Sequence, residues 1–145
     1  MNRPVTPTLA ADAIVELVHL PDRPIVLIER KNPPHGWAIP GGFVDIGETL
    51  EAAAIREAKE EISLDIELAC LLGMYSHPTR DPRGHTVTAV YVATATGQPQ
   101  AADDAKRLDI FSLDNLPSPL AFDHVMVLED FRRYREYGEL APLRI

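Results

Sequence analysis

Three glutamates stand close together in a segment whose pattern predicts a helix over residues 49–62. Successive residues of a helix turn by about 100°, so Glu57, Glu60 and Glu61 fall within an arc of about 100°. That arc continues the face on which the small apolar residues of the first turns point toward the protein. Half-buried carboxylates that repel one another are unfavourable, and a divalent cation with oxygen ligands removes both problems. The spacing therefore predicts a metal site on this helix.

The alternative interpretation is a solvated acidic helix face, with Arg56 and Lys59 as surface partners of the carboxylates. The loop before the helix favours the metal site. Three glycines in that loop, Gly41, Gly42 and Gly47, let the backbone approach a ligand closely. A main-chain carbonyl of this loop would then complete the coordination shell of the metal.

The elements that must position this helix are separated by prolines, of which the chain has 13. A second helix is predicted over residues 123–137. Strands are predicted over residues 9–18, 24–30, 65–75, 86–95 and 107–112. Residues 31–42 are expected to form a loop with a short extended piece at 37–39. Strands before, between and after two helices predict an α/β fold, a mixed sheet with a helix on each face.

Composition and charge exclude several classes of protein. The 145 residues predict one domain, 1–145, that can bury a single core. Lys plus Arg is 14 and Asp plus Glu is 22, and the resulting net charge of −8 argues against binding nucleic acid by bulk charge. The single cysteine, Cys70, permits no intramolecular disulfide. No apolar run reaches the about 20 residues of a membrane span, and Asp12 and Glu16 interrupt the first apolar stretch, so we expect a cytoplasmic protein without a membrane partner.

The segment GGFVDIGETLEAAAIREAKEEISL, residues 41–64, resembles the Nudix box. That pattern is a glycine, five residues, Glu, seven residues, and then Arg-Glu-aliphatic-x-Glu-Glu-x-Gly-aliphatic. The corresponding residues of this chain are Gly42, Glu48, Arg56, Glu57, Ala58, Glu60, Glu61, Ser63 and Leu64. Trp37 followed by Pro-Gly-Gly at 40–42 also looks like the family. Two positions depart from it, since Ser63 replaces a glycine and Ala58 is only minimally aliphatic.

The resemblance implies a Nudix-fold α/β/α sandwich with a mixed β-sheet. It also implies hydrolysis of a nucleoside diphosphate linked to another moiety, a small-molecule substrate, with Mg²⁺ or Mn²⁺. The metal ligands carried over are the main-chain carbonyl of Gly41 and the side chains of Glu57, Glu60 and Glu61. The catalytic residues carried over are Glu48, Arg56, Glu57 and Glu60. Of these, Glu48 and Arg56 would orient the helix and its ligands, and Glu57 or another acid would accept the proton of the attacking water.

A basic loop, HPTRDPRGH at residues 77–85, stands out in an acidic protein. Residues 81–84 fit a type I turn, and the alternative interpretation is that turn alone. The turn does not explain why Arg80, Arg83 and His85 crowd together, and cationic side chains of this kind suit an anionic ligand. We therefore predict Arg80, Arg83 and His85 as substrate-binding residues. His19, His35 and His124 show no metal-ligand spacing and are expected to be ordinary.

Three further stretches resemble the ADP-ribose pyrophosphatases within the Nudix family. They are LLGMYSHPTRDPRGHTV around the basic loop, DDAK at 103–106 and LAFDH at 120–124. This resemblance implies that ADP-ribose is cleaved to AMP and ribose 5-phosphate. Many Nudix enzymes use a further acid outside the box, for which the candidates here are Asp103, Asp104 and Asp109.

Two other functions stay open at this point. One is a nucleotide-pool hydrolase that acts on a damaged nucleoside triphosphate. The other is a non-catalytic sensor that binds ADP-ribose, which the intact glutamates and the lack of room for DNA-binding helices in 145 residues disfavour. The sequence is silent on oligomeric state, although the resemblance implies that a homodimer is common in the family.

Overall fold

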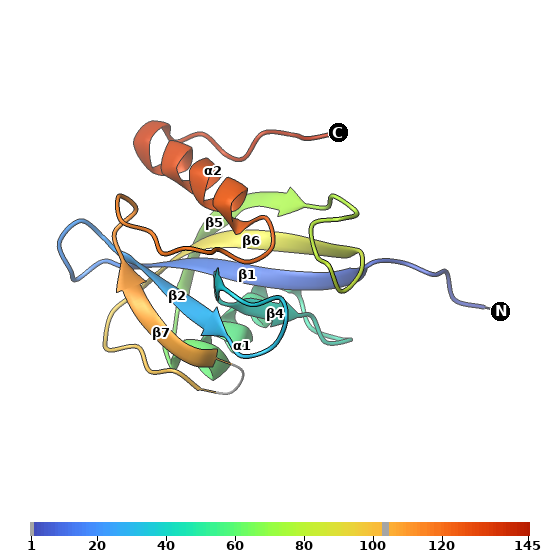
Figure 1. The fold of residues 1–145 in the computed structure, drawn as a ribbon, viewed down its shortest axis with the longest axis horizontal. Helices are drawn as coiled ribbons and strands as arrows, with labels where there is room; N and C mark the ends of the chain where they lie inside the picture. Colours follow the sequence, from blue (N-terminus) through green and yellow to red (C-terminus); the bar gives the residue numbers. More distant parts are fainter. Residues whose placement is uncertain (1, 103–104) are drawn as a thin grey trace.

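The computed structural model describes residues 2–102 and 105–145 (Figure 1). Its elements are β1 (Thr8–Leu17), β2 (Ile25–Arg30), β3 (Trp37–Ala38), β4 (Gly41–Phe43), α1 (Leu50–Ile62), β5 (Glu67–Tyr75), β6 (Thr86–Ala95), β7 (Ala105–Phe111) and α2 (His124–Tyr137). Each predicted element is present with ends that agree within about two residues. The segment expected to be a loop also contains the short strand β4. Within the described ranges, no helix is long and apolar enough to cross a membrane.

The strands form one mixed sheet in the order β3-β2-β1-β6-β5. Strand β1 runs parallel to β6 along its whole length, and β5 lies antiparallel on the outer side of β6. On its other side β1 has two partners. It pairs with β2 at Glu16↔Ile25, near its end, and with β4 in its first half, where Asp12 lies opposite Gly41. This change of partner places the glycine loop beside the middle of β1.

A helix covers each face of the sheet, as Figure 1 shows with α2 above the strands and α1 below them. Because successive side chains of a strand point to opposite faces of the sheet, neighbouring residues of β1 pack against different helices. Val15 packs in the core that contains Ile62 of α1, whereas Ile14 packs in the core that contains Phe131 of α2. The predicted α/β/α sandwich with a mixed sheet is confirmed.

The two ends of α1 are formed by Thr49 and Ser63, one through its side chain and the other through its backbone. The hydroxyl of Thr49 accepts a hydrogen bond from the N–H of Ala52 at 3.0 Å and caps the first turn. At the other end Ser63 adopts the left-handed conformation, with φ 61° and ψ 31°, and its N–H donates to the carbonyl of Lys59. The helix stop of the Nudix pattern is therefore kept although a serine occupies it.

This geometry predicts the stability of two variants of Ser63. A left-handed residue with a Cβ is strained, so Ser63→Gly should unfold with a free energy about 1 kcal/mol higher than Ser63→Ala. The wild type should lie between the two variants, because its hydroxyl also donates to the carbonyl of Gln100 at 3.1 Å. Urea denaturation of the three proteins measures the order. Equal stability of the two variants would show that the strain is absent.

Candidate active site

Polar side chains from several elements line a cavity of about 330 Å³. Strands β1 and β4, helix α1, the basic loop and the segment before α2 all contribute to its lining. The residues that bear on its chemistry are Asp12, Gly41, Gly42, Glu57, Glu61, Arg80, Arg83, Phe122 and His124. The fold therefore brings two predicted regions together, since carboxylates of the acidic helix and arginines of the basic loop line one cavity.

Glu57, which is half-buried, and Glu61, which is buried, form a carboxylate pair in this cavity. Glu61 is 5% exposed, and its Oε1 accepts a hydrogen bond from the N–H of Gly41 at 2.9 Å. Burial and the charge of Glu57 raise the pKa of Glu61 to about 9, and burial also raises the pKa of Glu57. A Cβ on Gly42 would lie 2.6 Å from the carboxylate of Glu57, so only glycine permits this close packing.

The chemistry of this pair fits a divalent cation. Two adjacent buried carboxylates are stable only with a proton or a cation between them. Mg²⁺ usually binds through one or two carboxylates and completes its shell with water and substrate phosphates. Within residues 2–102 and 105–145, no three His, Cys, Asp or Glu side chains are arranged to hold a metal ion by themselves. The described side chains thus suit a cation that a phosphate ligand helps to bind.

Glu60 does not join the pair. Its side chain is 46% exposed, and it is absent from the residues that line the cavity. One oxygen of Glu60 lies 3.2 Å from Arg56, one turn earlier on α1. The structure therefore separates the three predicted metal ligands into a buried pair and a surface ion pair.

Arg56 connects α1 to the loop that precedes it. Its guanidinium donates to both carboxylate oxygens of Glu48, at 2.6 and 3.0 Å, and to the carbonyl of Phe43 at 3.1 Å. It also donates to Glu57 at 2.9 Å. The bonds from Arg56 and from the N–H of Asp45 lower the pKa of Glu48 to about 2. Glu48 and Arg56 are thus placed to orient Glu57, which is the role predicted for them.

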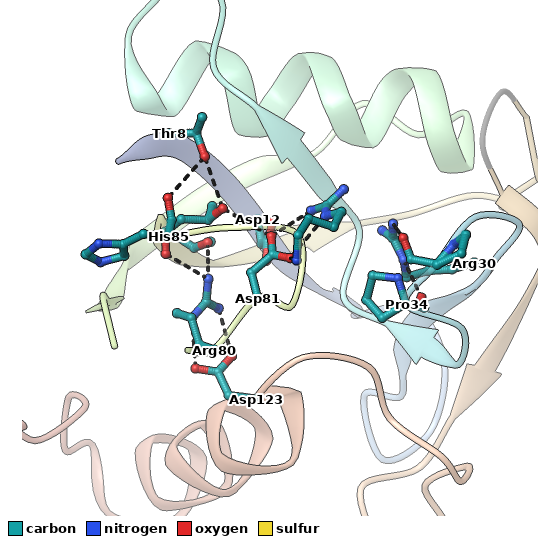
Figure 2. A network of polar contacts seen from close by, with 12 residues as sticks. Thr8, Asp12, Arg30, Pro34, Arg80, Asp81, His85 and Asp123 are labelled. Carbon is teal, nitrogen blue, oxygen red and sulfur yellow. Dashed lines mark hydrogen bonds and ion pairs between the residues drawn. The ribbon is translucent and has the colours of Figure 1, made fainter. Parts of the chain in front are cut away.

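Arg80 is buried by partners of its own. Its guanidinium donates to both carboxylate oxygens of Asp123, at 2.7 and 2.9 Å (Figure 2). It also donates to the hydroxyl of Thr88 at 2.7 Å. Its side chain is only 4% exposed. These contacts join the basic loop to the residue before α2. Most of the charge of Arg80 is therefore already paired within the protein.

Arg83 is the more accessible cation of the loop. Its side chain is 41% exposed and is held by Asp81, with nitrogen–oxygen distances of 2.9 and 3.0 Å. The guanidinium carbon lies 5.1 Å from the ring centre of Phe43 and 5.3 Å from that of Phe122. Phe43, Arg83 and Thr86 line both the cavity and a shallower hollow beside residues 5–8. Arg83 thus lies at the boundary between the cavity and the shallower hollow.

The remaining predicted residues lie outside the cavity or outside the described chain. His85 lines the shallower hollow, and its Nε2 lies 2.9 Å from the carbonyl of Ser76. Asp109 is exposed on β7 and accepts a hydrogen bond from the N–H of Ile110. Asp103 and Asp104 lie outside the residues that the structure describes.

Asp12 and His124 are cavity residues that sequence analysis did not predict as site residues. Asp12 of β1 and His124 of α2 are both buried, at 7% and 2% exposure, and both line the cavity. The signal for Asp12 was a carboxylate within an otherwise apolar strand, which sequence analysis used only against a signal peptide. His124 had no partner nearby in the sequence, because its neighbours in the cavity come from other elements.

The NUDIX domain model matches residues 8–131 of this chain. The chain belongs to the Nudix family. It is 46% identical over 132 residues to the ADP-ribose pyrophosphatase of Methanocaldococcus jannaschii, a match that covers 89% of this chain and 75% of that protein. The predicted family is confirmed, and the protein is a Nudix hydrolase similar to an ADP-ribose pyrophosphatase.

Two further comparisons concern ligands. The chain is 31% identical to the ADPR responsive transcriptional repressor NtrR of Acinetobacter baylyi, over 86% of this chain and 52% of that protein. Its fold matches a bifunctional NMN adenylyltransferase/ADP ribose pyrophosphatase from Francisella tularensis, complexed with AMP and a Mn ion. That match has a TM-score of 0.73 and 26% identity, and covers 90% of this chain and 42% of the other. Nudix hydrolases generally need a divalent metal, which agrees with the carboxylate pair.

Proposed function

We propose that this Nudix hydrolase cleaves ADP-ribose to AMP and ribose 5-phosphate with Mg²⁺ or Mn²⁺. The observation that carries the proposal is the cavity itself, in which Glu57 and Glu61 lie on the same lining as Arg83 and the ring of Phe122. The carboxylates suit a cation on the diphosphate, and the guanidinium and ring suit the groups at its ends. The 46% identity to an ADP-ribose pyrophosphatase supports this substrate.

In this proposal the residues of the site have separate roles in binding the cation and in accepting a proton. Glu57 and Glu61 hold the cation, together with the carbonyl of Gly41, and Arg56 fixes the direction of Glu57. When bound, the cation neutralises the diphosphate and lowers the pKa of a coordinated water. A carboxylate of the site would accept the proton of the attacking water.

Local charge explains how an acidic protein would bind an anionic substrate. The net charge of −8 repels a diphosphate at long range. Around the cavity, however, four basic side chains contribute to the lining: Arg30, Lys31, Arg80 and Arg83. The same lining carries five carboxylates, Asp12, Asp45, Glu57, Glu61 and Asp81, so a bound cation must add its charge to these basic groups before the local field favours a diphosphate.

A substrate panel tests the proposal. We expect the purified protein to release AMP and ribose 5-phosphate from ADP-ribose with Mg²⁺ or Mn²⁺, and to release neither in excess EDTA. Faster turnover of an oxidised nucleoside triphosphate would favour the nucleotide-pool hydrolase. Tight binding of ADP-ribose without turnover would favour a sensor, the alternative that the similarity to a transcriptional repressor supports.

A further inference from the structure

Asp12 is a buried carboxylate for which the protein provides no hydrogen-bond donor. Its side chain is 10% exposed, and this remaining surface faces the cavity that it lines. Among residues 2–102 and 105–145, no side chain or main-chain group donates a hydrogen bond to either carboxylate oxygen within ordinary distance. Among the described residues no fully buried side-chain oxygen lacks a partner, so the open side of Asp12 is in reach of the cavity, where water or a ligand must supply its hydrogen bonds.

Glu16, on the same strand, is a buried carboxylate that is paired within the protein. It lies four residues further along β1 and is 4% exposed. Its two oxygens are paired with Arg23 at 2.5 Å and with Arg135 at 2.9 Å. Glu16 is thus neutralised by Arg23 and Arg135, whereas the carboxylate of Asp12 is available to a ligand in the cavity.

His124 holds Asp12 in place from the side of α2. The N–H of Ile39 donates to Nδ1 of His124 at 3.1 Å, so Nδ1 carries a lone pair and the proton sits on Nε2. That Nε2 lies 3.5 Å from Oδ2 of Asp12, which is longer than an ordinary hydrogen bond. The Nε2–H group is thus the donor that faces Asp12, and at this distance it does not satisfy the carboxylate by itself.

The opposite side of Asp12 faces the carboxylate pair. Asp12 lies opposite Gly41 in the β1–β4 register, and a Cβ on Gly41 would come within 1.8 Å of Oδ1 of Asp12. The N–H of the same glycine donates to Glu61. One peptide thus separates the two carboxylates, and the charge of Asp12 contributes to the raised pKa of Glu61.

We infer that Asp12 is a third carboxylate of the divalent-cation site, supplied by β1 outside the Nudix box, and that His124 is its positioning residue. The inference rests on the cation site of the proposed function and not on its substrate. In this role Asp12 would accept hydrogen bonds from water of the cation's shell, since no three side chains in the described ranges are arranged to hold an ion directly. Such a contact leaves Glu57 and Glu61 as the direct side-chain ligands.

Binding of Mn²⁺ alone to the metal-free protein tests this role. The EPR signal of free Mn²⁺ gives the dissociation constant without any substrate. Loss of a residue that bonds to the ligands of a metal typically weakens metal binding about 10- to 100-fold, and we expect this for Asp12→Asn. The matched control is Glu16→Gln, which removes one buried negative charge about 13 Å further along the strand, beyond the Debye length, and should leave the affinity unchanged.

Two variants of His124 test its positioning role. His124→Gln keeps an acceptor for the N–H of Ile39 and a donor toward Asp12. His124→Phe keeps a ring of similar size but loses both the acceptor and the donor. We expect Mn²⁺ binding to weaken about tenfold in His124→Phe and to recover most of that loss in His124→Gln. Equal affinities of the two variants would remove the positioning role.

The melting temperature of the metal-free protein separates a cation role from a structural one. Asp12→Asn removes a charge that repels Glu61, so its melting temperature should be equal to or above that of the wild type. A lower melting temperature, unchanged Mn²⁺ affinity in Asp12→Asn, or a wild type that binds no Mn²⁺ would each overturn the inference. If Mn²⁺ binding depends on Asp12 but ADP-ribose is left intact, the substrate proposal fails and the inference stands.

Discussion

Glu61→Gln is expected to reduce kcat at least about 100-fold while raising the melting temperature of the metal-free protein. The two effects have one cause. Glu61 is 5% exposed beside Glu57, and this arrangement is unfavourable without a cation. The amide removes the repulsion and also removes one ligand of the cation. Steady-state kinetics with Mg²⁺ and thermal unfolding in EDTA measure the two effects separately.

The same residue predicts how the stability of the metal-free protein depends on pH. The pKa of Glu61 is raised from 4.5 to about 9 in the folded state. Between these values the folded state holds a proton that the unfolded state has lost, so the free energy of unfolding falls as the pH rises. Urea denaturation in EDTA at about pH 5 and about pH 8.5 should therefore show a decline in the wild type and a smaller one in Glu61→Gln.

Glu60→Gln is the matched control on the same helix. Glu60 is half exposed and paired with Arg56, so its amide variant should keep the stability profile of the wild type and lose less turnover than Glu61→Gln. Near-native turnover of Glu61→Gln would contradict the metal assignment. A loss in Glu60→Gln as large as that in Glu61→Gln would show that Glu60 also reaches the cation during the reaction.

Arg80→Ala is expected to act mainly on the fold. The substitution leaves Asp123 without its two-pronged partner and the hydroxyl of Thr88 without its donor, next to the first turn of α2. Breaking one side of a buried ion pair costs about 3 kcal/mol or more of unfolding free energy. Denaturant unfolding measures this loss, and Arg80→Lys, which keeps the charge but not the fork, should recover part of it.

Arg83→Ala is expected to act mainly on the substrate. The side chain is 41% exposed, and its loss leaves the buried Asp81 with the N–H of residue 83 and the hydroxyl of Thr86 as donors, so stability should fall by less than in Arg80→Ala. Loss of a charged hydrogen bond to the substrate should raise the KM for ADP-ribose about ten- to a hundredfold, with a smaller effect on a simpler nucleoside diphosphate. If both arginine variants fold and hydrolyse ADP-ribose like the wild type, the basic loop is only a turn.

Much of this protein could be predicted from local patterns. The spacing of apolar residues in α1, its cap at Thr49 and the prolines between elements predicted the helices and the main strands. The Nudix box singled out Glu48, Arg56, Glu57 and Glu61 by residue type and spacing, and their roles in the site stay predictions. The elements and the family could be predicted because helix periodicity, capping and a motif on one helix all depend on residues that are close in the chain.

Tertiary structure decided what depends on residues far apart in the chain. Strand β1 pairs with β4 in its first half and with β2 near its end. The pairing with β4 brings Gly41 to Asp12, and the start of α2 brings His124 to the same point. The sequence predicted Arg80 as a ligand-binding cation because its partner Asp123 lies 43 positions away. The helical wheel grouped Glu60 with Glu61, but the neighbouring elements bury one and leave the other to Arg56. Angular position is a property of the helix alone, whereas burial depends on what the rest of the chain places against it.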